Sequence, residues 1–346
     1  MNGVRSEQVR SAHPRYATDA WRTMPLNATS LRHLPRRVTT VLAATITTLS
    51  LGTAAGALAT PTPPTPTQLA AQIKAATTKP ATTDLGPQVL AAAKSSYELG
   101  PCVQNQSTPG DRFLQCDFGS THATKTVVLL GDSQAAMWLP AFDAAGQAHN
   151  FHVVLLARLG CNSNPLVLLS FTGTVDAQCS VFRKASLKYI KTLHSPLVFV
   201  SQMHRYQVSA SNTPVSDANW TTSMKTLYSS LKASGASSIS FIEEAPVDPV
   251  DAAGCLARNL TASHKCTYSA SLGIISSARA ADEAAASVSH VPVINTMPIF
   301  CTSLAIATST QCPVQVNGVL VYADRWHTTS QYAAYSWQAL AALAKL

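Results

Sequence analysis

Three side chains in this sequence could together perform nucleophilic chemistry. Ser133 ends a Gly-Asp-Ser triplet that directly follows the apolar run 126–130. A serine hydroxyl becomes a useful nucleophile when a base removes its proton, and a histidine does so when a carboxylate fixes its tautomer. Asp324 and His327 are three residues apart, so a tight turn would let their side chains face each other. The chain order Ser, Asp, His is one that nucleophilic hydrolases use.

Each motif alone also has a plain structural explanation. A Ser or Asp at the turn between a strand and a helix often only caps the helix. A histidine at the start of a helix is often a cap or a surface residue. The two motifs in one chain, one after a buried strand and one before a final helix, are more specific than either alone.

Five apolar, β-branched runs predict the strands that would position these side chains. The runs are 126–130, 152–157, 196–201, 238–243 and 291–296. Segments with helical spacing follow them, at 134–148, 180–193, 217–233, 268–288 and 329–344. Continuous apolar runs suit strands buried on both faces. The alternation predicts an α/β fold, a three-layer α/β/α sandwich around a central, mostly parallel five-stranded sheet. Ser133 would lie beyond the carboxyl end of a strand, where active sites of open sheets lie.

The residues around both motifs resemble the SGNH/GDSL hydrolase superfamily, which implies a flavodoxin-like, SGNH hydrolase-like fold. The segment 131–140, GDSQAAMWLP, is similar to the GDSHAxxWLP block of one branch. Cys301, the Cys312–Pro313 pair and the segment 321–328, VYADRWHT, are similar to its closing block, CxxxxCP…YxDxxHLT. That branch is the SGNH domain usually fused behind acyltransferase-3 membrane proteins, which O-acetylate bacterial surface polysaccharides. The resemblance covers roughly residues 84–345.

The resemblance implies a role for each candidate residue. Ser133 would be the nucleophile, His327 the general base and then acid, and Asp324 the residue that orients His327. The backbone N–H of Ser133 would form part of the oxyanion hole. Gly160, after the second predicted strand, stands where the family's oxyanion glycine is expected, and an ordinary turn glycine is the alternative. Neither a metal nor a cofactor is expected.

Two positions depart from the family pattern. Gln134 stands where the branch usually has His, and we expect it to contact the substrate. The superfamily's Asn after the third strand is not obvious; Gln202 would supply an amide donor in its place, or is a surface residue without a role. Arg205 and Trp326 complete the expected substrate-binding residues, Arg205 for an anionic group and Trp326 because it precedes His327.

A pair of carboxylates follows the fourth predicted strand. Glu243 and Glu244 are of the type that glycosidases use. Adjacent residues of a strand point to opposite faces, however. We therefore do not expect these two residues to work as a catalytic pair.

The cysteines predict an oxidising environment. All eight lie after residue 100, in four pairs that are close in the sequence. We expect the disulfides Cys102–Cys116, Cys161–Cys179, Cys255–Cys266 and Cys301–Cys312. None of the cysteines forms a CxxC motif, which argues against a metal site, and a set of free buried thiols is the alternative.

Residues 1–59 predict an export leader. Arginines precede an uncharged stretch, 38–59, that ends in Ala-Leu-Ala, a pattern typical of signal peptidase cleavage. The stretch is long enough to span a bilayer, so a retained membrane anchor is the alternative. Most of the net charge of +8 falls in this leader, so no basic stripe typical of nucleic-acid binding remains. Residues 60–83, rich in Pro, Thr and Ala, would be a spacer, and residues 84–346 the SGNH hydrolase-like catalytic domain.

The function that the resemblance implies is serine-dependent O-acyl chemistry in the cell envelope. An acyl group, acetyl above all, would be transferred to a carbohydrate or hydrolysed from one through an acyl-enzyme on Ser133. Transferases and esterases share this intermediate, so the motifs do not separate them. Because the chain carries no multi-pass membrane segment, a transferase would receive its acyl group from a separate acyltransferase-3 membrane protein. A catalytically silent carbohydrate-binding or scaffold protein of the envelope is the alternative from another class.

Overall fold

The computed structural model describes residues 61–89, 102–105, 107–114, 116–170, 173–204 and 208–346. The chain divides into two units, residues 1–56 and 57–346, and every described residue belongs to the second. The predicted leader, 1–59, lies outside the described residues, so its cleavage or retention stays a prediction. Within the described ranges, no helix is long and apolar enough to cross a bilayer.

The core of the fold is a six-stranded sheet in the order β1-β3-β2-β4-β5-β7. Its strands are β1 Phe118–Gly119, β2 Thr126–Gly131, β3 His152–Ala157, β4 Leu197–Ser201, β5 Ser238–Ile242 and β7 Val293–Ile294. The last five pair in parallel, and β1 adds a short antiparallel edge to β3. The predicted parallel five-stranded sheet is therefore confirmed, and the parallel strands have the flavodoxin-like order 2-1-3-4-5.

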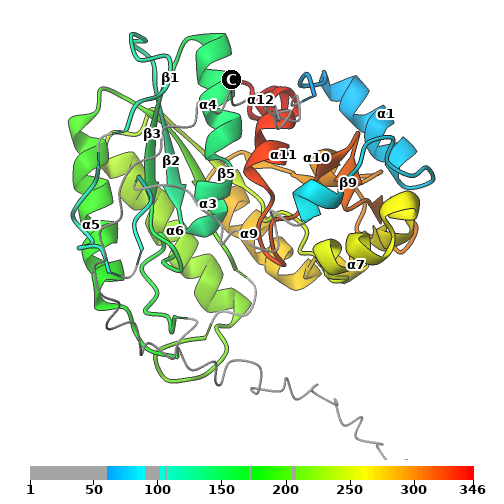
Figure 1. Ribbon diagram of the computed structural model, residues 1–346. Coiled ribbons are helices and arrows are strands. Elements are labelled where there is room, and N and C mark those ends of the chain that lie inside the picture. The colour runs from blue at the N-terminus through cyan, green and yellow to red at the C-terminus, as the bar shows by residue number, and fades with distance from the viewer. Residues whose placement is uncertain (1–60, 90–101, 106, 115, 171–172, 205–207) are drawn as a thin grey trace, which may run out of the picture. The chain divides into compact units, whose positions relative to one another are not determined.

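Two hydrophobic cores lie on the two faces of this sheet, as the alternation within β2 shows. Val127 and Leu129 join one cluster and Val128 and Leu130 the other, all almost fully buried. Three helices contribute to the second cluster: α5 Ala177–Thr192, α6 Asp217–Ala233 and α9 Ser276–Val288. The first cluster includes residues of α3 Ser133–Met137, α4 Leu139–His149, α11 Ser330–Tyr335 and α12 Trp337–Ala344. The result is the three-layer sandwich that the sequence predicts (Figure 1).

Smaller elements fill the region between β5 and the final helices. They are α7 Ala252–Arg258, the 3₁₀ helix Leu260–Cys266, β6 Tyr268–Ser269, α8 Ala270–Gly273, α10 Met297–Phe300, β8 Gln311–Cys312, β9 Gln315–Val316 and β10 Val319–Leu320. β6 pairs with β8, and β9 with β10, both antiparallel. The single helix expected over 268–288 is therefore wrong at its start, where Tyr268 pairs with Cys312 in a β-ladder and α9 begins only at Ser276.

Helix α1, Pro66–Ala76, lies within the predicted spacer, residues 60–83. Thr65 and Gln68 form a capping box at its start. Leu69 and Ile73, one helical turn apart, are fully buried in the first core cluster. A capped, Ala-rich helix with two large apolar residues on one face has a surface to bury. The stretch 66–76 therefore packs against the first core cluster.

All four expected disulfides are present. The Cα–Cα distances are 6.1 Å for Cys102–Cys116, 5.6 Å for Cys161–Cys179, 5.8 Å for Cys255–Cys266 and 4.2 Å for Cys301–Cys312. No cysteine is left free. The local pairing predicted from the sequence is confirmed.

Candidate active site

The turn after β2, residues 131–134, carries Ser133 and is called the Ser133 turn below. A Cβ on Gly131 would lie 1.8 Å from the carbonyl oxygen of Ser201, at the end of the neighbouring strand β4. Only glycine therefore lets β2 and β4 approach this closely at their carboxyl ends. Ser133 is the first residue of α3 and is 8% exposed.

Asp132 holds this turn to the end of β4. One carboxylate oxygen accepts the backbone N–H of Gln134 at 2.8 Å and so caps α3. The other accepts the backbone N–H of Met203, two residues past β4, at 2.9 Å. Burial, the largest effect, and the nearby Glu244 raise the pKa of Asp132, the two backbone donors and His327 lower it, and the net pKa is about 6.

The second part of the site is the loop 324–327, called the His327 loop. The two carboxylate oxygens of Asp324 lie 2.9 and 2.8 Å from Nδ1 of His327. One of them also accepts the backbone N–H groups of Trp326 and His327. Burial alone would raise the pKa of Asp324, but the hydrogen bond and charge of His327 and these backbone donors outweigh it and hold the pKa below its ordinary value.

This pairing fixes the proton on the His327 ring. An ionised carboxylate accepts hydrogen bonds and cannot donate one. Nδ1 of His327 therefore carries the hydrogen that points to Asp324, and the lone pair of the neutral ring is on Nε2. The side chain of His327 is 14% exposed, against 44% for Asp324, so the ring is shielded while its carboxylate partner is half in solvent.

Gln134 joins the two parts of the site. Its amide Nε2 donates to the carbonyl oxygen of Trp326 at 2.9 Å. The residue after Ser133 thus contacts the residue before His327, and the structure brings the Ser133 turn and the His327 loop together. Gln134 is 2% exposed. This hydrogen bond uses the amide nitrogen, whereas the buried Oε1 has no hydrogen-bond partner among the residues that the structure describes. The expected contact of Gln134 with substrate stays a prediction.

Gly160 lies in the turn that follows β3. Its φ of 70° and the hydrogen bond from Cys161 N–H to the Arg158 carbonyl define a tight turn that favours glycine. The backbone N–H of Arg158 donates to the carbonyl of Gly131 at 3.2 Å, so this turn starts beside the Ser133 turn. The fully buried Arg158 is paired with Asp176 at 2.8 Å, which holds the turn rigidly. The turn geometry alone explains the glycine; its part in an oxyanion hole stays a prediction.

The other predicted binding residues have different surroundings. Gln202 is fully buried; its carbonyl oxygen accepts the N–H of Ser163 at 2.7 Å, and its Nε2 lies 2.8 Å from Sδ of Met224. Both ends of this amide are engaged inside the protein, so our mechanism does not use it as an oxyanion donor. Trp326 is half-buried with the Arg325 guanidinium 5.2 Å from its ring centre. Arg205 lies outside the described residues.

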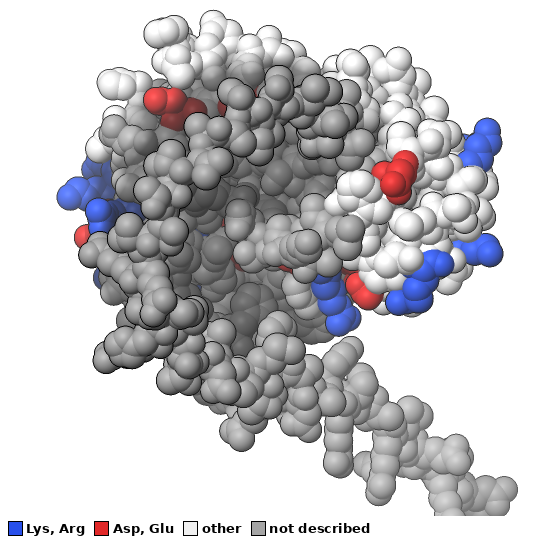
Figure 2. Space-filling model, viewed as in Figure 1, with Lys and Arg blue, Asp and Glu red and all other residues white. Residues whose placement is uncertain are grey.

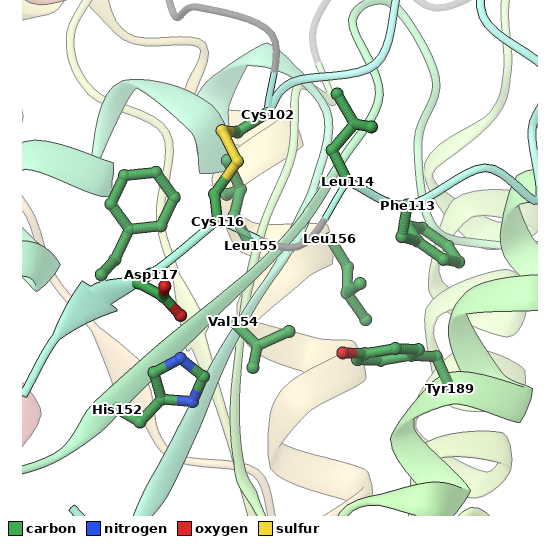
Figure 3. A pocket seen from close by; sticks show the side chains of 11 residues that line it. Cys102, Phe113, Leu114, Cys116, Asp117, His152, Val154, Leu155, Leu156 and Tyr189 are labelled. Atoms are coloured by element: carbon green, nitrogen blue, oxygen red, sulfur yellow. A yellow bond between two sulfur atoms is a disulfide. The ribbon is translucent and has the colours of Figure 1, made fainter. Parts of the chain in front are cut away.

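Two cavities differ in whether residues of this site line them. A cavity of about 650 Å³ adjoins the His327 loop and is lined by residues 322–325, by Asp248 and Pro249, by α7 residues and by Val89. A smaller one of about 230 Å³ lies along β3, between the Cys102–Cys116 disulfide and the ring of Tyr189 (Figure 3). The lining of the smaller cavity includes no residue of the Ser133 turn or the His327 loop. The larger one contacts the His327 loop through Asp324 and Arg325, and its lining includes neither Ser133 nor His327.

Neither the basic side chains on the face seen in Figure 2 nor the possible metal ligands among the described residues gather into a single cluster. On the face seen in Figure 2, the described Lys and Arg side chains lie apart at the rim and form no single patch. Among the residues that the structure describes, no group of three or more His, Cys, Asp or Glu side chains is arranged to hold a metal ion.

A parallel sheet with a serine after its first long strand, and an Asp–His pair on the loop before the last helices, defines the class of SGNH-like α/β proteins. Residues 101–340 match the family model described as the SGNH domain (fused to AT3 domains), and the chain belongs to this family. The periplasmic domain of the lipopolysaccharide acetyltransferase of Salmonella ser. Paratyphi A is similar in fold, with a TM-score of 0.53 and 13% sequence identity. That similarity covers 77% of this chain and 98% of the other. No curated protein matches the chain.

Proposed function

We propose that this protein is an extracytoplasmic serine O-acyltransferase or esterase that acts on cell-envelope carbohydrate through an acyl-enzyme on Ser133. The observation that carries the proposal is the Asp324–His327 hydrogen bond on a loop tied to the Ser133 turn by Gln134. A carboxylate, an imidazole and a serine on contacting loops are the parts that nucleophilic acyl transfer needs.

The proposed reaction has two halves. Nε2 of His327 removes the hydroxyl proton of Ser133 as the serine oxygen attacks the acyl carbonyl. The backbone N–H of Ser133, with that of Gly160, stabilises the oxyanion. His327 then returns its proton to the departing alcohol, leaving an ester on Ser133. In the second half, a sugar hydroxyl or water gives its proton to His327 and attacks this ester, and the proton passes back to Ser133 as its oxygen leaves.

We infer the kind of substrate from the family, and the side of the membrane from the disulfides. The family is named for domains fused to AT3 domains, and the similar Salmonella domain belongs to a lipopolysaccharide acetyltransferase of the periplasm. Four disulfides favour the same side of the membrane, because cytosolic thiols are kept reduced. We infer an acetyl group, a glycan acceptor or acetylated glycan, and an acyltransferase-3 membrane protein as the donor in the transferase case.

Transfer and hydrolysis differ in what reaches the acyl-enzyme. Water is always present, so transfer needs a sugar hydroxyl held in attacking geometry, which can contribute effective molarities of about 10⁵ M or more. The 650 Å³ cavity beside Asp324 has the volume of a typical ligand pocket. We propose it as the acceptor site, because Asp324 and Arg325 of the His327 loop are among the residues that line it.

The first test is covalent labelling of the intact protein with a fluorophosphonate. The wild type should be labelled at Ser133, and Ser133→Ala should not. Ser229→Ala, a variant of an exposed serine on α6, is the matched control and should be labelled like the wild type. An unlabelled Ser133 in a folded protein would contradict the proposal and favour the catalytically silent carbohydrate-binding protein.

The second test separates transferase from esterase. Ser133 is acetylated with p-nitrophenyl acetate in the presence of increasing envelope oligosaccharide, and acetylated sugar and free acetate are measured. Diversion of acetyl to the sugar supports transfer. Acetate as the sole product at every sugar concentration supports the esterase.

A further inference from the structure

Carboxylates that follow the two neighbouring strands bind the backbone at the end of β4. One belongs to Asp132, beside Ser133; the other belongs to Glu244, which has no role in the mechanism above. Asp132, after β2, accepts the backbone N–H of Met203. Glu244, after β5, accepts the next backbone N–H, that of His204. Because β4 lies between β2 and β5 in the sheet, two consecutive amide groups are bound by carboxylates from its two neighbours.

We propose that Glu244 is a positioning residue of the acyl-transfer site, which acts on Ser133 through the end of β4 and Asp132. This inference rests on the proposed function. Asp132 connects Met203 to Gln134, next to Ser133. A displacement of residues 203–204 would therefore be passed through the Asp132 side chain to the start of α3.

The ring of His204 and its backbone N–H contact different layers of the fold; the ring lies 3.4 Å from a carboxylate oxygen of Asp282 on α9. The His204 ring stacks on Trp220, with 4.0 Å between ring centres and an angle of 4° between the planes. Its Nδ1 lies 3.0 Å from the carbonyl oxygen of Ala278 on α9, and the residue is 5% exposed. The ring is thus fixed to the helical layer, and the backbone contact with Glu244 fixes this residue to β5.

Glu244 also acts on Asp132 through charge. Both oxygens of Asp132 accept backbone N–H groups, and both contacts favour the ionised form of this carboxyl. Burial and the neighbouring Glu244 both raise the pKa of Asp132. The charge of His327 lowers the pKa of Asp132, and Glu243, Arg279 and Asp282 line a small cavity together with Glu244. Arg279 is already paired with Glu243 and Glu283.

Two substitutions at position 244 separate its contact from its charge. Glu244→Gln keeps an oxygen that can accept the His204 N–H and removes the negative charge. The titration midpoint of Asp132 should then move to lower pH, and kcat above pH 7 should stay within about twofold of the wild type. Glu244→Met removes the acceptor as well and should lower kcat roughly tenfold at every pH, with KM little changed, because misplacement of a nucleophile acts on the chemical step.

The titration is read directly on the full chain labelled with ¹³C at its aspartate carboxyl carbons. The Asp132 resonance is assigned by its loss in Asp132→Asn, and p-nitrophenyl acetate turnover is measured on the same samples. Glu283→Gln removes a half-exposed carboxylate from α9 and is the control, with no expected change. The NMR titration needs no turnover, so it stays informative even if Ser133→Ala shows that the proposed function is wrong.

An Asp132 midpoint that is the same in Glu244→Gln and wild type would overturn the charge linkage. A folded Glu244→Met with wild-type kcat would overturn the positioning role. If Glu244→Met does not fold, Glu244→Gln decides the matter: a lower midpoint with preserved kcat supports the proposal, and a tenfold loss of kcat despite the retained acceptor contradicts it.

Discussion

Two aspartates border the same candidate site, and their surroundings shift their pKa values in opposite directions. Asp132 is 2% exposed and accepts two backbone N–H groups, yet burial raises its pKa to about 6. The Asp324 side chain is 44% exposed and faces His327, and its pKa is lowered. Two neutral donors do not compensate a carboxylate for the loss of water, whereas an imidazole that can carry positive charge does. Asp132 is thus suited to hold structure and Asp324 to support a proton transfer.

The largest expected effect comes from replacing each aspartate with asparagine. Asp324→Asn should lower kcat for p-nitrophenyl acetate by about 10³–10⁴-fold, because the amide no longer selects the Nδ1–H tautomer of His327. Its melting temperature should hardly change, since the Asn oxygen can still accept the loop N–H groups. Asp132→Asn should instead lower the unfolding free energy by about 1–3 kcal/mol, because one buried N–H faces an NH₂ group. Equal losses of activity and stability in both variants would remove the distinction between the two residues.

A smaller effect is expected in the pH dependence of stability. A carboxyl whose pKa is raised by folding binds its proton more tightly in the native state, so its stabilisation is full below pH 4 and is lost as the pH rises through about 6. Wild type should therefore lose about 2 kcal/mol relative to Asp132→Asn between pH 4 and 6.5. The lowered pKa of Asp324 has the opposite sign: its contribution is present above the unfolded pKa and is lost on acidification. Urea unfolding across pH measures both slopes, and slopes of the same sign would contradict the assignment.

The smallest expected effect concerns Gln134, which links the two regions. Gln134→Ala and Gln134→Glu should each lower kcat roughly tenfold, because both remove the donor to the Trp326 carbonyl and loosen the His327 loop against the Ser133 turn. Gln147→Ala, at an exposed glutamine on α4, is the control and should match the wild type. Full activity in Gln134→Glu would mean that this hydrogen bond does not position the site.

The strands and the disulfides could be predicted because their signals are local. β3 has the bounds that its apolar run predicts, and each cysteine pairs with its neighbour in the sequence. Tyr268–Ser269 was expected in a helix because its partner in the β-ladder, Gln311–Cys312, is distant in the chain. The packing of α1 depends in the same way on a surface built from residues far along the sequence.

Within the site, the residues involved could be predicted more readily than their hydrogen-bond partners. Asp324 and His327 are three residues apart, so their contact follows from the turn. The capping explanation for the Gly-Asp-Ser triplet turns out to hold for Asp132, whose second contact, with Met203, no local pattern reveals. Glu243 and Glu244 lie just past the end of β5 and have different partners: the first pairs with Arg279 and the second accepts the His204 N–H. The hydrogen bond of Gln134 could not be predicted, because its partner Trp326 is 192 residues away in the sequence.

For the extracytoplasmic location that we propose, the spacing of the disulfides has a consequence for how they form. Each joins cysteines only 11 to 18 residues apart, and no bridge encloses or crosses another. The loop to be closed is short in every case, so the entropic cost of closing the native pairs is lower than for most of the roughly 105 possible pairings of eight cysteines. The bridges can therefore form one after another as the chain emerges from a translocation pore, each before the next cysteine pair appears. A simple thiol oxidant is then enough for correct pairing, without an isomerase to reshuffle mismatched bonds.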